Sequence, residues 1–179
     1  MEDSIHCLKR WRPRALDAWR FLLLAGFLVT LSVQSRAEVF ESTFLRFRLP
    51  DGWKCKFEED VFTCQPPLAK GQKHSMLIIV TAKYHGEGDT LPDYMIHLRT
   101  PGTIDGPKIN NSIGKVAWVE ATLLDSELKG YYTKYLTTVW NGVAILVTFS
   151  VHKDSSPRFQ ALIAPCIQSM ELKSDWKKK

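Results

Sequence analysis

The stretch YYTKYLTTVWNGVAILVTFSV, residues 131–151, decides the fold. Asn141-Gly142 at its centre is the strongest short-range signal for a β-hairpin with a two-residue type I′ turn. Pairing the chain about this turn places one apolar set on a single face: Leu136, Trp140, Val143, Ile145, Val147, Phe149 and Val151. The opposite face mixes Tyr135, Val139, Ala144 and Leu146 with threonine and serine. We therefore expect a long hairpin with the core on one side and a helix partly covering the other.

Strand patterns also occur on both sides of this hairpin. Residues 44–49 alternate and end at Pro50-Asp51-Gly52, and residues 115–124 are rich in valine, threonine and tryptophan. Residues 76–82 form a continuous apolar run of strand length. Such a run predicts a strand in the middle of the sheet, buried on both faces.

Two helices are predicted from capping signals and apolar spacing. Thr90 begins the first, with Asp93 completing a capping-box pattern and Pro101-Gly102 ending it. Ser156 and Pro157 begin the second. Pro165 inside it is expected to kink it. Its apolar positions form one stripe: Phe159, Leu162, Ile163, Cys166, Ile167 and Met170.

These elements predict an α+β fold, with a central, mostly antiparallel sheet of six or seven strands flanked by helices, as an α/β/α or a two-layer α+β sandwich. A single domain over residues 38–179 is expected, because about 142 residues build one core and not two.

The first 37 residues have the pattern of a signal peptide. Five basic residues precede the apolar run 21–33, which has 13 residues, whereas a membrane-spanning helix needs about 20. Ser35-Arg36-Ala37 offers small residues at the cleavage positions, so the mature chain is expected to start at Glu38. An uncleaved signal anchor is the alternative. The expected location is periplasmic or secreted.

The charge of the mature chain is nearly balanced. Removing residues 1–37 takes away six of 24 Lys and Arg and three of 19 Asp and Glu, which leaves a net charge of +2. Nucleic-acid binding needs a basic face with motif support, and the sequence has neither. Nucleic acid is therefore excluded as an expected partner.

Cys55 and Cys64 are expected to form a disulfide. With Glu59-Asp60 as a two-residue turn, the two cysteines are directly opposite each other in a non-hydrogen-bonded pair of a hairpin. Such a pair brings the Cα atoms to about 4.5 Å, at the short end of the range that a disulfide accepts. Two unpaired thiols are the alternative. Cys166, on the apolar stripe, is expected to stay a buried free thiol.

The only acidic and histidine cluster in a predicted loop is His85, Glu87 and Asp89. It is a candidate binding loop and the only place for a metal-dependent or acid–base site. The favoured interpretation is structural: the glycines supply a turn, Asp89 helps to cap the following helix, and His85 is solvated. No nucleophile motif or phosphate-binding glycine loop occurs, so the sequence predicts no catalytic residues, no cofactor and no metal ligands.

Together, Phe47-Arg-Leu-Pro-Asp-Gly-Trp53, the run 76–82, the capped helix, the meander and the C-terminal Phe-x-x-Leu-Ile helix resemble the PsbP-like fold group. This group includes the PsbP subunit of photosystem II, a Ran-binding nuclear-import factor and the periplasmic DcrB-like proteins. The resemblance covers nearly all of residues 40–172. It implies a central antiparallel sheet flanked by helices, and a binding or accessory role without family catalytic residues.

The sequence thus favours a non-catalytic exported accessory protein that engages an unknown protein partner or a membrane complex. Peripheral membrane association is part of this hypothesis, which uses an open sheet face or the loops 70–73 and 84–89. Two alternatives remain open. One is a carrier of a small apolar ligand, which needs an apolar cavity of at least about 300 Å³. The other is a small metal-dependent hydrolase at His85, Glu87 and Asp89.

Overall fold

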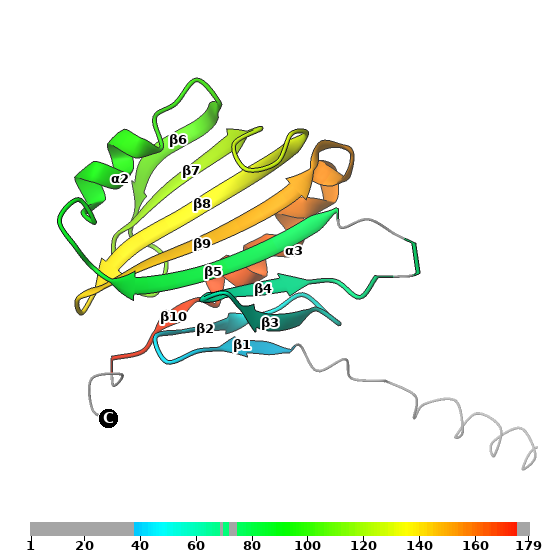
Figure 1. Cartoon of the computed structure of the whole chain (residues 1–179), viewed down its shortest axis with the longest axis horizontal. Helices are drawn as coiled ribbons and strands as arrows, with labels where there is room; N and C mark the ends of the chain where they lie inside the picture. Colours follow the sequence, from blue (N-terminus) through cyan, green and yellow to red (C-terminus); the bar gives the residue numbers. More distant parts are fainter. Residues whose placement is uncertain (1–37, 69, 72–74, 175–179) are drawn as a thin grey trace, which may run out of the picture. The chain divides into compact units, whose positions relative to one another are not determined.

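The computed structural model describes residues 38–68, 70–71 and 75–174, so the predicted signal peptide lies outside the described residues. The larger of its two sheets has seven antiparallel strands in the order β3-β4-β5-β9-β8-β7-β6 (Figure 1). These strands are β3 (Lys54–Glu58), β4 (Val61–Gln65), β5 (Met76–Tyr84), β6 (Thr103–Asn110), β7 (Trp118–Leu124), β8 (Tyr131–Trp140) and β9 (Val143–His152). The smaller sheet contains β1 (Val39–Glu41), β2 (Leu45–Arg48) and β10 (Glu171–Leu172). The predicted α+β class is confirmed.

The hairpin β8–β9 is the centre of the larger sheet, with the predicted register. Trp140 pairs with Val143 across the turn, where Asn141 and Gly142 have φ values of 52° and 83°. The side chains of Val143, Ile145, Val147, Phe149 and Val151 are all buried on one face. The predicted core face is therefore confirmed.

Helix α3 (Ser156–Gln168) covers that core face. Four side chains of its stripe are buried and two are half-buried: Phe159, Ile163, Cys166 and Met170, then Leu162 and Ile167. The predicted cap is wrong by one residue. The 3₁₀ turn η1 (Lys153–Ser155) runs directly into the helix, so Ser155 is the N-cap and its side chain makes no capping hydrogen bond.

Helix α2 (Leu91–His97) lies over the opposite face, where it packs against β7 and β8 (Figure 1). The hydroxyl of its N-cap, Thr90, accepts a hydrogen bond from the backbone N–H of Asp93, as the capping pattern predicted. The helix buries none of its side chains completely. This shallow contact leaves space between α2 and the sheet.

Three features differ from the sequence-based expectation. The strand predicted at 44–49 is β2, which pairs with β1 and β10 in the smaller sheet and not with the larger one. Strand β5 lies mid-sheet between β4 and β9, but only its core-facing Ile78 and Val80 are buried, since α2 packs over β7 and β8. Strand β6 was not predicted, because two register shifts and Gly106-Pro107 interrupt its alternation.

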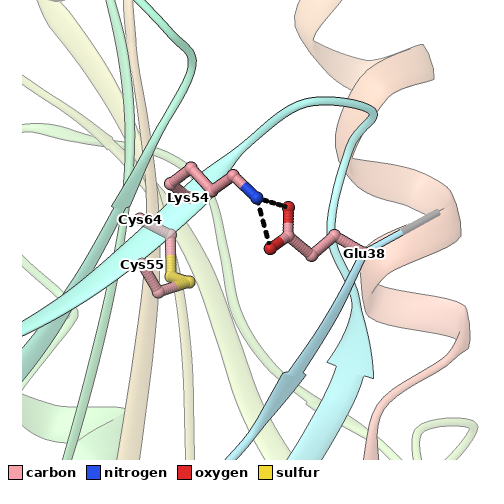
Figure 2. Close-up of a disulfide and its surroundings, with 4 residues drawn as sticks. All are labelled: Glu38, Lys54, Cys55 and Cys64. Atoms are coloured by element: carbon pink, nitrogen blue, oxygen red, sulfur yellow. Dashed lines mark hydrogen bonds and ion pairs between the residues drawn. A yellow bond between two sulfur atoms is a disulfide. The ribbon is translucent and has the colours of Figure 1, made fainter. Parts of the chain in front are cut away.

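The hairpin β3–β4 has the predicted register, with Cys55 opposite Cys64 and Phe57 opposite Phe62. The two cysteines form a disulfide with Cα atoms 4.0 Å apart (Figure 2). Beside it, Lys54 donates to both carboxylate oxygens of Glu38 at 2.7 and 2.8 Å. Cys166 is a buried free thiol, and burial raises its pKa to about 11.

Reduction of this disulfide is expected to lower the stability without unfolding the protein. A closed loop of about ten residues stabilises by roughly 2–3 kcal/mol in the chain-entropy model, and the core under α3 does not depend on it. Thermal unfolding with and without a phosphine reductant measures the loss. Under denaturing conditions, the mature chain should take up one alkyl group before reduction and three after it. Three alkyl groups before reduction would show that the cysteines are free.

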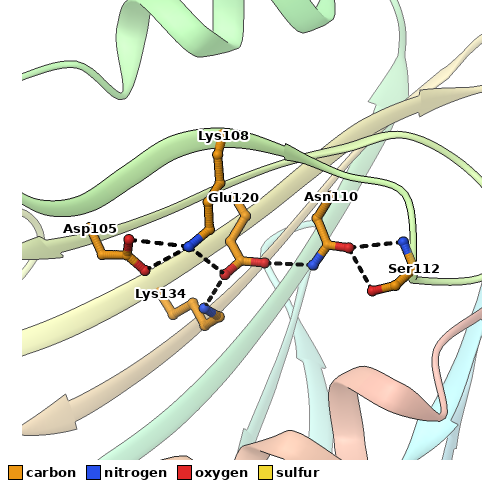
Figure 3. A network of polar contacts seen from close by, with 6 residues as sticks. All are labelled: Asp105, Lys108, Asn110, Ser112, Glu120 and Lys134. Carbon is orange, nitrogen blue, oxygen red and sulfur yellow. Dashed lines mark hydrogen bonds and ion pairs between the residues drawn. The ribbon is translucent and has the colours of Figure 1, made fainter.

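A polar network lies on the α3-side face of the sheet, at β6, β7 and β8 (Figure 3). Its centre is the buried Glu120, which accepts from Lys134 at 2.6 Å and from the Asn110 amide at 2.7 Å. Lys108 lies 3.9 Å from Glu120 and 3.1 Å from Asp105. Burial alone would raise the pKa of Glu120, but the bonds from Lys134 and Asn110 hold it below its ordinary value. Glu120 is therefore ionised and paired in the folded protein.

Candidate functional site

A groove of about 320 Å³ lies between α2 and the sheet, on the face opposite α3. Its floor comes from β5, β8 and β9, and its wall from Tyr94, His97 and Leu98 at α2. Most of its lining surface is apolar. Its volume falls at the lower end of the range of small-molecule sites, which are concave, mostly apolar and equipped with a few polar groups.

Small side chains on the floor create the space. Across three neighbouring strands, Thr81 pairs with Leu146, which pairs with Thr137. In the next row, Lys83 pairs with Ala144. At Thr81, Thr137 and Ala144 the floor carries small side chains, which leave unfilled the volume that larger ones would occupy.

Asp89 closes one end of the groove and fixes the loop before α2. Its carboxylate accepts from the Gly86 N–H at 2.8 Å and from the Tyr94 hydroxyl at 3.0 Å, and its other contact is Lys83 Nζ at 3.1 Å. The Gly86 hydrogen bond and then Lys83 hold the pKa of Asp89 below its ordinary value. This carboxylate therefore joins the loop, the helix and β5, and its charge is balanced by Lys83.

Two tyrosines line the groove, with their hydroxyls turned to protein partners. Tyr94 donates to Asp89, while Tyr135 contacts Ser126 at 3.0 Å and Glu127 at 2.6 Å. Burial, and next the hydrogen bond to a carboxylate, raises the pKa of each tyrosine to about 12. Both side chains are thus neutral, and their polar atoms are already satisfied.

The structure brings only one member of the predicted binding loop into the groove. Asp89 lines it, whereas the backbone N–H of His85 donates to Gly142 O at 3.1 Å and Glu87 is exposed outside it. The histidine that does line the groove is His97. Within the described part of the chain, no hydrogen bond or ion pair joins His97 or His152 to Glu87 or Asp89, and no group of three or more His, Cys, Asp or Glu could hold a metal.

The sequence reasoning missed most of the groove. It predicted a helix over the face that carries Tyr135, Ala144 and Leu146, but not a hollow beneath that helix. The signal was present in the small residues Ala144 and Thr137, which stand on that face among larger ones. Pairing of Lys83 with Asp89 depends on the path of the loop, which local patterns do not define.

No protein-family model matches the sequence, and no curated protein is significantly similar to it in sequence. Solved structures do resemble it. One from Bacteroides thetaiotaomicron VPI-5482 superposes with a TM-score of 0.57 at 14% identity, over 78% of this chain and 50% of that chain. This chain therefore spans about half the length of that protein.

A second structure is cyanobacterial PsbP (CyanoP) from Synechocystis sp. PCC 6803, with a TM-score of 0.56 at 12% identity. The match covers 78% of this chain and 94% of that chain, so nearly the whole of the cyanobacterial domain is reproduced. At these identities the likeness concerns the fold alone. The chain has a PsbP-like fold.

Proposed function

We propose that this chain is an exported, non-catalytic binding protein and that the groove beneath α2 takes an apolar ligand. The groove itself carries the proposal, because a volume of about 320 Å³ with apolar walls matches the expected size and chemistry of a small-ligand site. The signal-peptide pattern and the Cys55–Cys64 disulfide support export. No helix among the described residues is long and apolar enough to cross a membrane.

The chemistry of the walls favours a neutral ligand. The two charged groups at one end, Lys83 and Asp89, are 3.1 Å apart and balance each other. The hydroxyls of Tyr94 and Tyr135 are bonded to carboxylates, so both residues offer mainly their apolar parts. A charged ligand would compete with the ion pair of Lys83 and Asp89, whereas an apolar one leaves all of these interactions intact.

A metal-dependent hydrolase at the 85–89 loop gains no support from these contacts. Three donors from Gly86, Lys83 and Tyr94 already occupy the oxygens of Asp89. A carboxylate with this surrounding stabilises a loop and is poorly placed to act as a metal ligand or a general base.

Filling the groove is expected to abolish most of its binding. N-phenyl-1-naphthylamine, a neutral apolar fluorophore, should bind the wild-type protein with a saturable rise in fluorescence. Ala144→Leu places three additional carbon atoms on the floor and should weaken binding at least tenfold. Ala161→Leu, on the exposed side of α3, is the matched control and should bind like wild type.

Urea unfolding of both variants separates loss of binding from loss of fold. The proposal is contradicted if Ala144→Leu is folded and binds the fluorophore as tightly as wild type does. It is also contradicted if the wild-type protein gives no saturable signal.

A further inference from the structure

Strand β1 has a free edge. It pairs with β2 so that Glu38 O accepts from Leu49 N–H, and Ser42 N–H donates to Leu45 O. In an antiparallel ladder the hydrogen-bonded pairs alternate, so the backbone groups of Val39 and Glu41 point away from β2. The sheet order ends at β1, and no other strand among the described residues pairs with that side.

This edge borders a hollow of about 360 Å³ with a mixed lining, in which Glu38 and Glu41 stand beside several apolar residues. The hairpin β3–β4 contributes Cys55, Phe57 and Phe62 to the hollow, while β1 contributes Val39 and Phe40. The Phe62 ring lies 4.7 Å from Phe57 and 5.1 Å from Phe40, centre to centre. An aromatic surface therefore lies directly beside unpaired backbone.

Phe57, beside the hollow, is 60% exposed, which is unusual for a phenylalanine. Val39 is 53% exposed, but its side chain alternates with that of the buried Phe40 and so lies on the opposite face of β1. The exposed apolar surface at the hollow is therefore the Phe57 ring, which packs against the ring of Phe62. The ion pair between Lys54 and Glu38 connects β3 to the start of β1 and holds one end of the hollow in place (Figure 2).

By comparison, both edge strands of the larger sheet are protected against the addition of another strand. Strand β3 has exposed Lys54, Lys56 and Glu58, and strand β6 contains Pro107 and two register shifts. Charges, prolines and irregular pairing are the usual means by which proteins prevent strand addition. Strand β1 has only three residues, which limits a docked strand to a few main-chain hydrogen bonds, but it contains no proline or register shift, and the charge of Glu41 is paired with Lys173 at 2.6 Å.

We infer that the edge of β1 is a docking site for an extended segment of a partner protein. The segment would pair with Val39 and Glu41 as a fourth strand of the smaller sheet and place a bulky apolar side chain against Phe57 and Phe62. Main-chain hydrogen bonds supply affinity in this mode of recognition, and the pocket for alternate side chains supplies specificity. The inference deepens the proposed binding role, but it does not depend on the α2 groove, with which this hollow shares no lining residue.

The probe is a fluorescein-labelled peptide, Lys-Val-Thr-Phe-Thr-Val-Lys, titrated by fluorescence anisotropy. Two N-methylated versions of the peptide are compared with it. One is methylated on the odd-numbered inner residues and the other on the even-numbered inner residues, so each version lacks the N–H donors along one edge of the extended peptide. With its apolar face in the hollow, a peptide that runs antiparallel to β1 presents one edge to that strand, and a parallel peptide presents the other, so a single bound orientation uses the donors of one edge only. One methylated version should therefore lose at least tenfold in affinity while the other binds like the parent peptide. Equal affinity of the two versions would overturn the inference.

Protein variants test the same site from the other side. Val39→Pro removes an N–H that points outward and should weaken peptide binding at least tenfold with little change in the urea midpoint. Val39→Thr keeps the N–H and should bind like wild type. Phe57→Ser should also weaken binding, and Ile96→Ser, at a 70% exposed site on α2, is its control.

The remaining outcomes also decide the question. Wild-type affinity in both Val39→Pro and Phe57→Ser, or no binding of the parent peptide, would overturn the inference. Sedimentation of the protein alone identifies a different occupant: a wild-type dimer that Val39→Pro converts to monomer would show that the edge pairs with a second copy. Ala144→Leu separates the two proposals. Because the groove and the hollow share no lining residue, this variant should bind the peptide like wild type whether or not it binds the fluorophore.

Discussion

Truncation of Ile163 to alanine is expected to lower the free energy of unfolding by about 2–5 kcal/mol. Ile163 is fully buried in the middle of the α3 stripe, where it belongs to the core cluster with Ile78, Val147 and Phe149. The loss combines the transfer energy of the removed carbons with the cavity that remains, because a close-packed core relaxes only partly.

Ile96→Ala is the matched control for this variant. Ile96 is also helical but 70% exposed, so its truncation should change stability by no more than about 0.5 kcal/mol. Urea unfolding at constant pH measures both variants. An unchanged midpoint for Ile163→Ala would show that the α3 stripe does not form the core.

Replacing Lys134 by methionine is expected to destabilise by about 3 kcal/mol at pH 7. The Lys134 and Glu120 side chains are only 12% and 9% exposed and lie 2.6 Å apart. Removing one member of a buried pair leaves the other charge without its main partner, which costs more than the intact pair contributes. Lys54→Met is the control, since Lys54 is 71% exposed and its pair with Glu38 should contribute less than about 1 kcal/mol.

The effect of Lys134→Met should depend on pH. In the wild-type protein the pKa of Glu120 is lowered from 4.5. The ionised carboxylate therefore adds to the free energy of unfolding above that pH, and this addition is lost as the pH falls through the lower pKa of the folded protein. Without Lys134, burial should raise the pKa of Glu120 above the unfolded value, and the penalty then grows as the pH rises. The difference between the variant and wild type should therefore be smaller at pH 4 than at pH 7. An equal difference at both pH values would contradict the assigned role of Glu120.

The parts of the fold that follow local rules were predictable from the sequence. The turn Asn141-Gly142 defines the register of β8 and β9, and the turn Glu59-Asp60 defines that of Cys55 and Cys64. Helix α3 follows from an apolar stripe with a proline near its start. In each case turn chemistry or helical periodicity acts within about twenty residues, so no distant contact has to be known.

The remaining features depend on distant contacts. Strand β2 joins β10 from the far end of the chain, a pairing that its own alternation does not indicate. The network at Glu120 joins three strands, and charged residues within strands give no sign that they will be buried together. For the candidate site, the sequence identified Asp89 but not its groove, because a hollow results from the fit of α2 against the sheet.

The most direct test of the binding role is to locate the bound probe by NMR. Titration of methyl-labelled protein with N-phenyl-1-naphthylamine should shift the methyl signals of Leu98, Ala144 and Leu146 and reach saturation at one probe per chain. The methyl groups of Leu45 and Leu172, in the smaller sheet, should stay in place. Saturable shifts centred on the groove are the result that this account predicts. Shifts centred on other residues, or no saturable shifts, would contradict it.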